Sequence, residues 1–247
     1  MKYSTKTLFA SVLTALALSA ASVSYGNTVV LYAGPAYSGN NSNPYQNGQG
    51  GEFTAITSNG IPAGYNSLAK YTNANGLTGF ETFCVEGGKN DVYFTPGVTY
   101  NYVTSDQIKG GPMGTLDLTV GVAYLYSQFA TGQLSGYFSG NRYTNAGALQ
   151  NAFWTLEGES SAPIAGWIQT LLVGQFGSIA NATLSVIQNA YDYDVQVMNI
   201  TNAAGASAQN QLIYTGRPVP DGGLTIVLLG ISFLGLALFK RQFGSRA

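Results

Sequence analysis

The chain has 247 residues, which is room for one domain of moderate size plus targeting segments. Its formal net charge is −1 and charged residues make up only 9%, so a nucleic-acid binder that works by charge is excluded. Because the chain has no His and a single Cys, His-based hydrolases, His-ligated metals, internal disulfides and Cys-based zinc sites are excluded too. We therefore predict no catalytic residue, no metal site and no cofactor.

Residues 1–26 are typical of a secretory signal peptide. Lys2 and Lys6 form a positive region, an apolar run follows at 8–18, and small residues then accumulate. Cleavage by signal peptidase after Ala21, or at the end of the segment, fits the small-residue rule. An uncleaved anchor is the alternative, but the apolar run is short for a membrane span.

Residues 27–217 are predicted to be the exported domain. They contain 5 Lys or Arg and 10 Asp or Glu, which gives a charge near −5 and suits solubility outside the cell. Residues 34–51 are predicted to form a long polar loop. Runs rich in aromatic and β-branched residues, separated by Gly, Asn and Pro, predict strands at 28–33, 52–57, 67–72, 77–86, 92–94 and 98–104.

The middle of the domain changes to a helical period. Asp117 would cap a first helix and Gly132 would follow it, because one helix face carries Leu118, Val122, Leu125 and Phe129. A second helix is predicted at 145–157, and the remaining elements are weaker helices at 164–173 and 182–190 and closing strands at 194–201 and 209–215. This order predicts a β-rich α+β domain, either a β-barrel or a sandwich, with a helical insert packed at one side.

Residues 218–247 are predicted to be a C-terminal sorting segment. It opens with a turn motif made of Val219, Pro220, Asp221, Gly222 and Gly223. Residues 224–239 are apolar or small and predict a transmembrane helix of about 24 Å, slightly short of a hydrocarbon core of about 30 Å. Lys240 and Arg241 would stop transfer and hold that end in the cytoplasm. An ordinary single-pass anchor and a tail that is cut after export both fit this pattern.

The tail resembles the PEP-CTERM class of sorting signals, in particular the VPDSG-CTERM variety. The match consists of the PVPDGG run at 218–223, the apolar helix and the two basic residues, and Gly222 stands where the name of that variety has Ser. The resemblance implies a Gram-negative bacterium that exports extracellular polymer, an inner-membrane intermediate, and processing by exosortase near Pro220. The product would be released to the cell envelope or the extracellular matrix.

Cys84 lies within the apolar strand pattern at 77–86, where a Cys is most often a small buried hydrophobe. An intermolecular disulfide is a second interpretation, which a buried strand position disfavours. Gln150 is the only polar member of the inner face predicted for the second helix, which comprises Ala146, Leu149, Gln150, Phe153 and Trp154. A buried carboxamide without partners costs roughly 1–3 kcal/mol, so Gln150 would either bond to backbone or react with Cys84. In the second case the thiolate expels ammonia and leaves an internal thioester, which needs a site closed to water.

Two short motifs resemble those of bacterial surface thioester domains. They are TFCVE at 82–86 and LQNAFW at 149–154. In that family an aromatic or aliphatic residue precedes the Cys, and the Gln opens a Q-x-A-hydrophobic-Trp run, which is matched here by Gln150, Ala152, Phe153 and Trp154. The resemblance implies a thioester-domain-like exported domain that attaches covalently to surface amines.

The sequence shows no acid–base pair, so we expect a structural or adhesive surface protein rather than an enzyme with turnover. The alternative is a biofilm matrix protein that binds exopolysaccharide without covalent chemistry. Glu86, Glu157 and Glu159 flank the two motifs. We expect these three to be solvated charges at the rim rather than a cluster beside the site.

Overall fold

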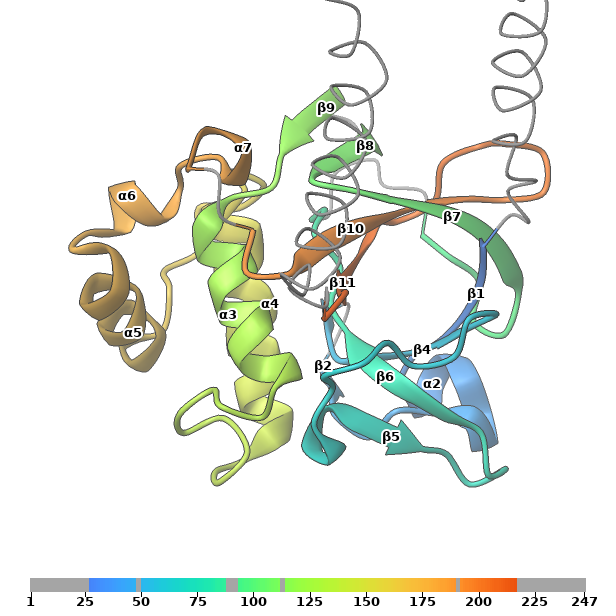
Figure 1. Ribbon diagram of the computed structural model, residues 1–247. Coiled ribbons are helices and arrows are strands. Elements are labelled where there is room, and N and C mark those ends of the chain that lie inside the picture. The colour runs from blue at the N-terminus through green and yellow to red at the C-terminus, as the bar shows by residue number, and fades with distance from the viewer. Residues whose placement is uncertain (1–26, 48–49, 88–92, 112–113, 190–191, 217–247) are drawn as a thin grey trace, which may run out of the picture.

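The structure is a computed structural model, and it describes residues 27–47, 50–87, 93–111, 114–189 and 192–216 (Figure 1). The predicted signal peptide and the whole predicted sorting segment lie outside these residues, including the turn motif, the apolar run at 224–239, Lys240 and Arg241. Among the described residues, no helix is long and apolar enough to cross a membrane.

Seven antiparallel strands form the main sheet, in the order β11-β10-β7-β1-β4-β6-β5. Their bounds are β1 (Asn27–Tyr32), β4 (Phe53–Thr57), β5 (Lys70–Thr72), β6 (Thr78–Thr82), β7 (Thr99–Ser105), β10 (Val195–Thr201) and β11 (Gln211–Tyr214). Two short ribbons accompany it, and they pair β2 (Gln46–Asn47) with β3 (Gly50–Gly51) and β8 (Gln107–Gly111) with β9 (Gly114–Asp117). The fold is α+β and rich in β-structure, as the sequence predicts.

The main sheet curves until its edge strand β11 meets the chain just beyond β6 (Figure 1). Two backbone hydrogen bonds of 3.0 and 3.2 Å join residues 83–85 to residues 210–212. Between them, Cys84 and Gln211 form an isolated bridge. Of the two predicted architectures, a β-barrel or a sandwich, the barrel is wrong, because the seven described strands of the main sheet form an open sheet. Strand β6 ends at Thr82, so only this short stretch reaches β11, and β5 continues the sheet on the other side of β6.

Helices cover one side of the curved sheet (Figure 1). The long helices α3 (Val120–Ala130) and α4 (Arg142–Leu156) lie next to the strands, and α5 (Gly166–Phe176), α6 (Ile179–Ala182) and α7 (Val186–Asn189) lie outside them. Thr119 caps α3, since its hydroxyl accepts from Val122 N at 3.4 Å. The predicted cap Asp117 is wrong, because Asp117 closes β9 and accepts from Gln107 Nε2 at 2.8 Å.

Other predicted boundaries also change. The predicted polar loop at 34–51 contains α2 (Pro35–Ser38), the 3₁₀ turn η1 (Gly39–Asn41) and the β2–β3 ribbon. The predicted strand at 67–72 begins as the 3₁₀ turn η2 (Ser67–Ala69), because the Asn66 side chain accepts from Leu68 N at 3.0 Å and turns the chain. Residues 93 and 94, predicted as strand, belong to no strand, and the β8–β9 ribbon was not predicted.

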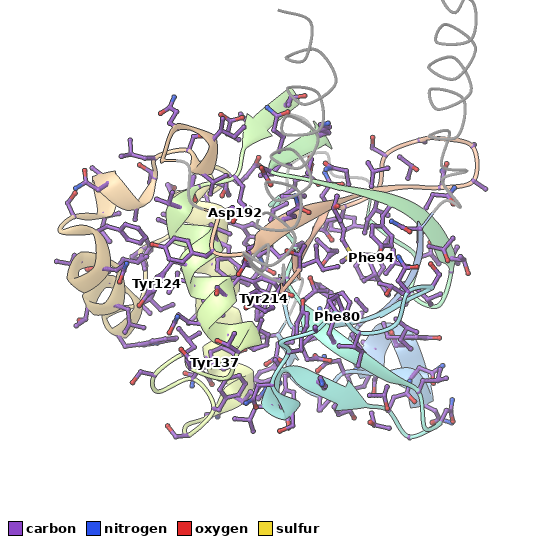
Figure 2. All side chains as sticks on the ribbon, in the orientation of Figure 1. Phe80, Phe94, Tyr124, Tyr137, Asp192 and Tyr214 are labelled. Carbon is purple, nitrogen blue, oxygen red and sulfur yellow. The ribbon has the colours of Figure 1, made fainter. Side chains whose placement is uncertain are left out.

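Aromatic side chains fill the space inside the curved sheet and between the helices. Phe80 and Phe94 lie inside the sheet, and Tyr124 joins α3 to α5 through an edge-to-face contact with Phe176 at 5.6 Å (Figure 2).

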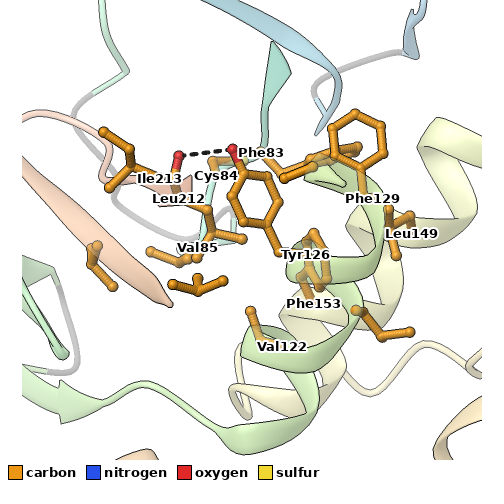
Figure 3. Close-up of a cluster of buried hydrophobic side chains, with 14 of the residues drawn as sticks. Phe83, Cys84, Val85, Val122, Tyr126, Phe129, Leu149, Phe153, Leu212 and Ile213 are labelled. Carbon is orange, nitrogen blue, oxygen red and sulfur yellow. Dashed lines mark hydrogen bonds between the residues drawn. The ribbon is translucent and has the colours of Figure 1, made fainter. Parts of the chain in front are cut away.

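Phe83 joins the strand side of the core to both long helices (Figure 3). Its ring centre lies 5.1 Å from that of Phe129 on α3 and 5.3 Å from that of Phe153 on α4, both edge-to-face. Such pairs contribute roughly 0.5–1.5 kcal/mol beyond the area they bury. Because Phe83 immediately precedes Cys84, this packing fixes α4 against the segment that carries the Cys.

Candidate functional site

Cys84 and Gln150 lie side by side, although they are 66 positions apart in the sequence. Cys84 follows the end of β6, Gln150 lies in the middle of α4, and both are buried, at 0% and 1% exposure. The thiol of Cys84 donates to Gln150 Oε1 at 3.2 Å. Because a C=O bond is about 1.2 Å long, the carboxamide carbon lies no more than about 4.4 Å from the sulfur. The structure thus brings together the two residues that the sequence singled out.

The Gln150 carboxamide takes the place of a strand partner for Cys84. Cys84 N donates to Oε1 at 3.2 Å, and Nε2 donates to the Cys84 carbonyl at 2.6 Å. Gly51 N, from β3, donates to the same Oε1 at 3.4 Å. The β4–β6 ladder ends at the pair Phe53 and Thr82. Beyond that pair, the Gln150 carboxamide bonds to the segment that precedes β4 and to the segment that follows β6. The side chain of Gln150 therefore makes hydrogen bonds to backbone, which was one of the two interpretations of this residue from the sequence.

The alternation of backbone directions along a strand explains why Cys84 meets α4. Its neighbours Phe83 and Val85 bond to the β11 side, so the N–H and C=O of Cys84 point toward Gln150 instead. Gln211 is the bridge partner of Cys84 and shares a face with it. The Gln211 carboxamide is fully buried, and neither its Nε2 nor its Oε1 has a hydrogen-bond partner among the described residues. No sequence signal pointed to it.

Trp154 and two glycines complete the site. Trp154 Nε1 donates to the Glu86 carbonyl at 2.9 Å. Its ring lies against Gly87, where an added Cβ would sit 2.9 Å from the ring Cγ. A Cβ on Gly50 would lie 2.4 Å from Gln150 Cγ and 2.9 Å from Trp154 Cη2. The absence of a side chain at these two positions lets α4 approach closely. The Q-x-A-hydrophobic-Trp run pointed to Trp154, whereas nothing distinguished these two among 32 glycines.

A groove of about 670 Å³ lies beside the carboxamide. Gln150 and Trp154 form part of its wall, and the other lining residues are small or polar: Asn47, Gly50, Gly87, Thr144, Gly147, Ala148, Asn151, Glu159 and Ser160. Cys84 is not among the lining residues, so Gln150 is the member of the pair that borders the groove. A molecule that enters the groove therefore meets Gln150 before it meets the sulfur.

Glu86 and Glu157 are buried, so their predicted position as solvated rim charges is wrong. The Glu86 carboxylate is 4% exposed and accepts from Asn210 N at 2.9 Å and Asn210 Nδ2 at 3.2 Å. Glu157 is 8% exposed and accepts from Thr119 N at 3.0 Å and Thr119 Oγ1 at 2.9 Å, and burial raises its pKa to about 7. Each carboxylate satisfies a backbone N–H of another segment, which explains its burial. Glu159 is partly exposed and lines the groove.

A second buried polar cluster, to which no pattern in the sequence points, lies at the start of α4. Arg142 Nε donates to Glu52 Oε1 at 2.7 Å, and Arg142 Nη2 donates to Glu52 Oε2 at 2.6 Å. Tyr137 OH also donates to Glu52 Oε1, at 2.7 Å. Nearby, Glu81 accepts from Asn43 Nδ2. Burial, and then the charge of Glu52, hold the pKa of Glu81 well above its usual value.

Residues 218–243 match the VPDSG-CTERM motif. The predicted resemblance of the tail to this variety of sorting signal is confirmed, with Gly222 where the name has Ser. The motif implies processing by exosortase, is consistent with export to the cell envelope, and indicates an exported, surface-sorted protein. No curated protein and no solved structure matches the chain significantly. The resemblance to thioester domains therefore rests on the two short motifs.

The arrangement around Gln150 has the parts of an acyl-transfer site. A thiol stands beside an amide carbonyl whose oxygen faces the N–H groups of Cys84 and Gly51. Such donors stabilise the negative charge that develops on a carbonyl oxygen when its carbon is attacked. The nitrogen that would leave is held by the Cys84 carbonyl. Burial of both side chains excludes water, which would otherwise hydrolyse a reactive acyl group.

Proposed function

We propose that this exported protein carries an internal thioester between Cys84 and Gln150, and that it has a structural or adhesive role at the cell surface. The observation that supports this best is the 3.2 Å contact of the thiol with the Gln150 carbonyl oxygen inside a water-excluded site. The two motifs that resemble thioester domains contain these same two residues.

The thioester forms by attack of Cys84 Sγ on the carboxamide carbon of Gln150. A C–S bond forms, the C–N bond breaks, and the nitrogen leaves as ammonia with the proton of the thiol. The N–H groups of Cys84 and Gly51 stabilise the oxyanion on Oε1 during this step.

A primary amine later attacks the same carbon and displaces the sulfur. The product is a secondary amide on Gln150 and a regenerated thiol on Cys84. Because each molecule reacts once, the protein is an attachment device and not an enzyme with turnover.

Intact mass of the full-length chain, purified in detergent, tests the proposal. We expect the protein to be lighter by one ammonia than the mass calculated for the residues between its actual termini. We also expect no thiol that can be titrated after unfolding, and addition of methylamine to Gln150. Cys84→Ala should abolish the mass loss and the addition of methylamine, and, because Cys84 is the single Cys of the chain, this variant has no thiol to titrate. Gln150→Glu, which keeps the size of the side chain, should restore a titratable thiol. A wild-type mass equal to the sequence mass, together with an ordinary thiol, would overturn the thioester.

A second part of the proposal concerns the processing of the C-terminal sorting segment at 218–247. We propose that residues 224–239 are held briefly in the inner membrane, and that cleavage near Pro220 releases the domain to the envelope or the matrix. The match of 218–243 to the sorting motif supports this order of events. Sequencing the C-terminus of the mature extracellular protein tests it. Recovery of an intact 224–239 segment in that form would favour a permanently anchored protein instead.

A second candidate function is non-covalent binding of exopolysaccharide. The groove beside Gln150 favours it, since an aromatic ring, amides and hydroxyls line its wall. Two results together would establish this function in place of the first. The wild-type protein would form no thioester, and Cys84→Ala would bind the organism's own exopolysaccharide saturably.

A further inference from the structure

We propose that the groove beside Gln150 binds a polymer of amino sugars, and that the amine of one such sugar is the nucleophile that the thioester consumes. This inference rests on the proposed function and names its substrate class. The chemistry of the groove wall supports it, together with the lack of any His that could take the proton of a strongly basic amine.

The groove wall suits a polyhydroxylated ring. Trp154 offers an aromatic surface against which the C–H face of a sugar can pack. Asn47 and Asn151 lie in the same wall, and an amide both donates and accepts hydrogen bonds, as a sugar hydroxyl does. The hydroxyls of Thr144 and Ser160 add the same dual capacity. The volume of about 670 Å³ falls in the range of pockets that enclose small organic ligands.

The charge in the groove selects against anions. Among the described residues that line it, Glu159 carries the one charged side chain. A carboxylate in the wall repels phosphate, sulfate and uronic acids and attracts an ammonium group. A neutral or amine-bearing sugar therefore fits better than an acidic one.

The reaction itself favours an amine of low basicity. An amine attacks an acyl carbon only in its neutral form, and the chain contains no His to take up the proton. A Lys amine, with a pKa of about 10.4, is less than about 0.1% neutral at pH 7. The oxygens next to the amine-bearing carbon of an amino sugar withdraw electrons and lower the basicity of its amine. A far larger fraction of that amine is ready to react.

The transfer step conserves atoms and charge. The neutral amine nitrogen of the sugar attacks the thioester carbon of Gln150, a C–N bond forms, and the C–S bond breaks. The departing Cys84 thiolate takes the proton that the new amide nitrogen gives up. The sugar is then held through a secondary amide on Gln150, and Cys84 is again a thiol.

Rates of amine addition to the full-length chain, followed by intact mass, test the proposal. The probes are a glucosamine trimer, its fully N-acetylated form, glycinamide, Nα-acetyl-lysine and methylamine. Glycinamide carries an α-amine with a pKa of about 8, so it controls for basicity without the sugar ring. We expect the trimer to add about tenfold or more faster than glycinamide at equal amine concentration, because the groove holds it near the acyl carbon. The N-acetylated trimer should not add, and it should slow addition of the trimer by competition.

A variant of the groove separates binding from basicity. Asn151→Ala removes an exposed amide from the groove wall on α4, and Ala is a good helix former. We expect it to lower the ratio of the trimer rate to the glycinamide rate by about threefold or more, as loss of a hydrogen bond would. Gln188→Ala, an exposed amide on α7 outside the groove, should leave that ratio unchanged.

The outcomes distinguish this inference from the proposed function. If methylamine adds but the trimer is no faster than glycinamide, the thioester stands and the amino-sugar proposal fails. Faster addition of Nα-acetyl-lysine than of the trimer would likewise overturn it, in favour of a protein target. If no amine adds and the mass equals the sequence mass, the thioester itself fails.

Discussion

Two buried polar clusters hold α4 to the sheet, and they differ in charge. At the start of the helix, Arg142 and Glu52 form an ion pair of 2.6 Å. Two turns further along, Gln150 holds Cys84 through hydrogen bonds between groups without formal charge. Breaking a buried ion pair leaves an uncompensated charge, whereas the neutral pair can change its bonding without that penalty. The ion pair therefore fixes the helix, and the thioester that we propose would form at the position that it fixes.

Removing the charge partner at the start of α4 should give the largest loss of stability. In Arg142→Ala, Glu52 keeps its buried position at 0% exposure without a counter-charge. We expect the free energy of unfolding to fall by about 3–5 kcal/mol. Denaturant unfolding, read as a lower midpoint at unchanged slope, measures it.

Arg142→Lys is the matched control. It keeps the positive charge and loses the two-pronged contact with Glu52, so its loss should be clearly smaller than that of the Ala variant. Equal and small losses in both variants would show that the ion pair does not fix the helix.

At the neutral cluster, the stability of Cys84→Ala should show whether the proposed covalent bond forms. A thioester would close a loop between Cys84 and Gln150, which lie 66 positions apart in the sequence, and would constrain the unfolded chain. Its removal should lower the free energy of unfolding by about 4 kcal/mol, as for a cross-link of that loop length. Without a cross-link, replacing a small buried hydrophobe should cost only about 1 kcal/mol.

Wild-type protein opened with methylamine is the control for Cys84→Ala. It has lost the cross-link and kept the sulfur, so it should unfold at nearly the same denaturant concentration as the Ala variant. A methylamine-treated protein as stable as the untreated one would argue against the cross-link.

Glu157, at the far end of α4, is a buried carboxyl group, and burial makes its charged form unfavourable. Its pKa is raised to about 7 by burial, from the ordinary value of 4.5. The folded state therefore binds the proton more tightly, and this carboxyl should make stability fall as pH rises from 4.5 to 7, by up to about 3 kcal/mol. Above pH 7 the contribution should level off. Unfolding free energies of wild type and Glu157→Gln, measured across this range, check it.

In Glu157→Gln the side-chain oxygen can still accept from Thr119, and no ionisation remains at that position. The fall in stability between pH 4.5 and 7 should therefore shrink in the variant relative to wild type. Parallel curves for the two proteins would assign the pH dependence to another group.

The sequence singled out Cys84 and Gln150, which lie together in the structure, and missed the residues that position them. Cys84 and Gln150 stood out because each is a polar or reactive group in an apolar pattern, which local periodicity reveals. The bonds that hold them depend on contacts between distant segments. Gly51 on β3 and Gln211 on β11 meet this site only through the curvature of the sheet.

The same reason explains the errors in the fold. Strand and helix patterns marked most of the larger elements, because periodicity is local. The end of β6 at Thr82 was missed because it depends on Gln150, a residue on another element, bonding to the next stretch of chain. Arg142 and Glu52, which form the ion pair, are 90 positions apart, and no local sequence pattern around either residue predicts that they pair.

The smallest expected effect on stability tests the close approach at the neutral cluster. In Gly50→Ala, the new methyl would meet Gln150 and Trp154 at 2.4 and 2.9 Å, so we expect a loss of about 1–3 kcal/mol from overpacking. Displacement of Gln150 should also prevent thioester formation, which intact mass detects. Gly174→Ala, on α5, is the control, since nothing lies within 4 Å of its added Cβ and helix propensity should raise stability by about 1 kcal/mol. A Gly50→Ala protein that still loses ammonia would show that the chemistry tolerates a looser fit between α4 and β3.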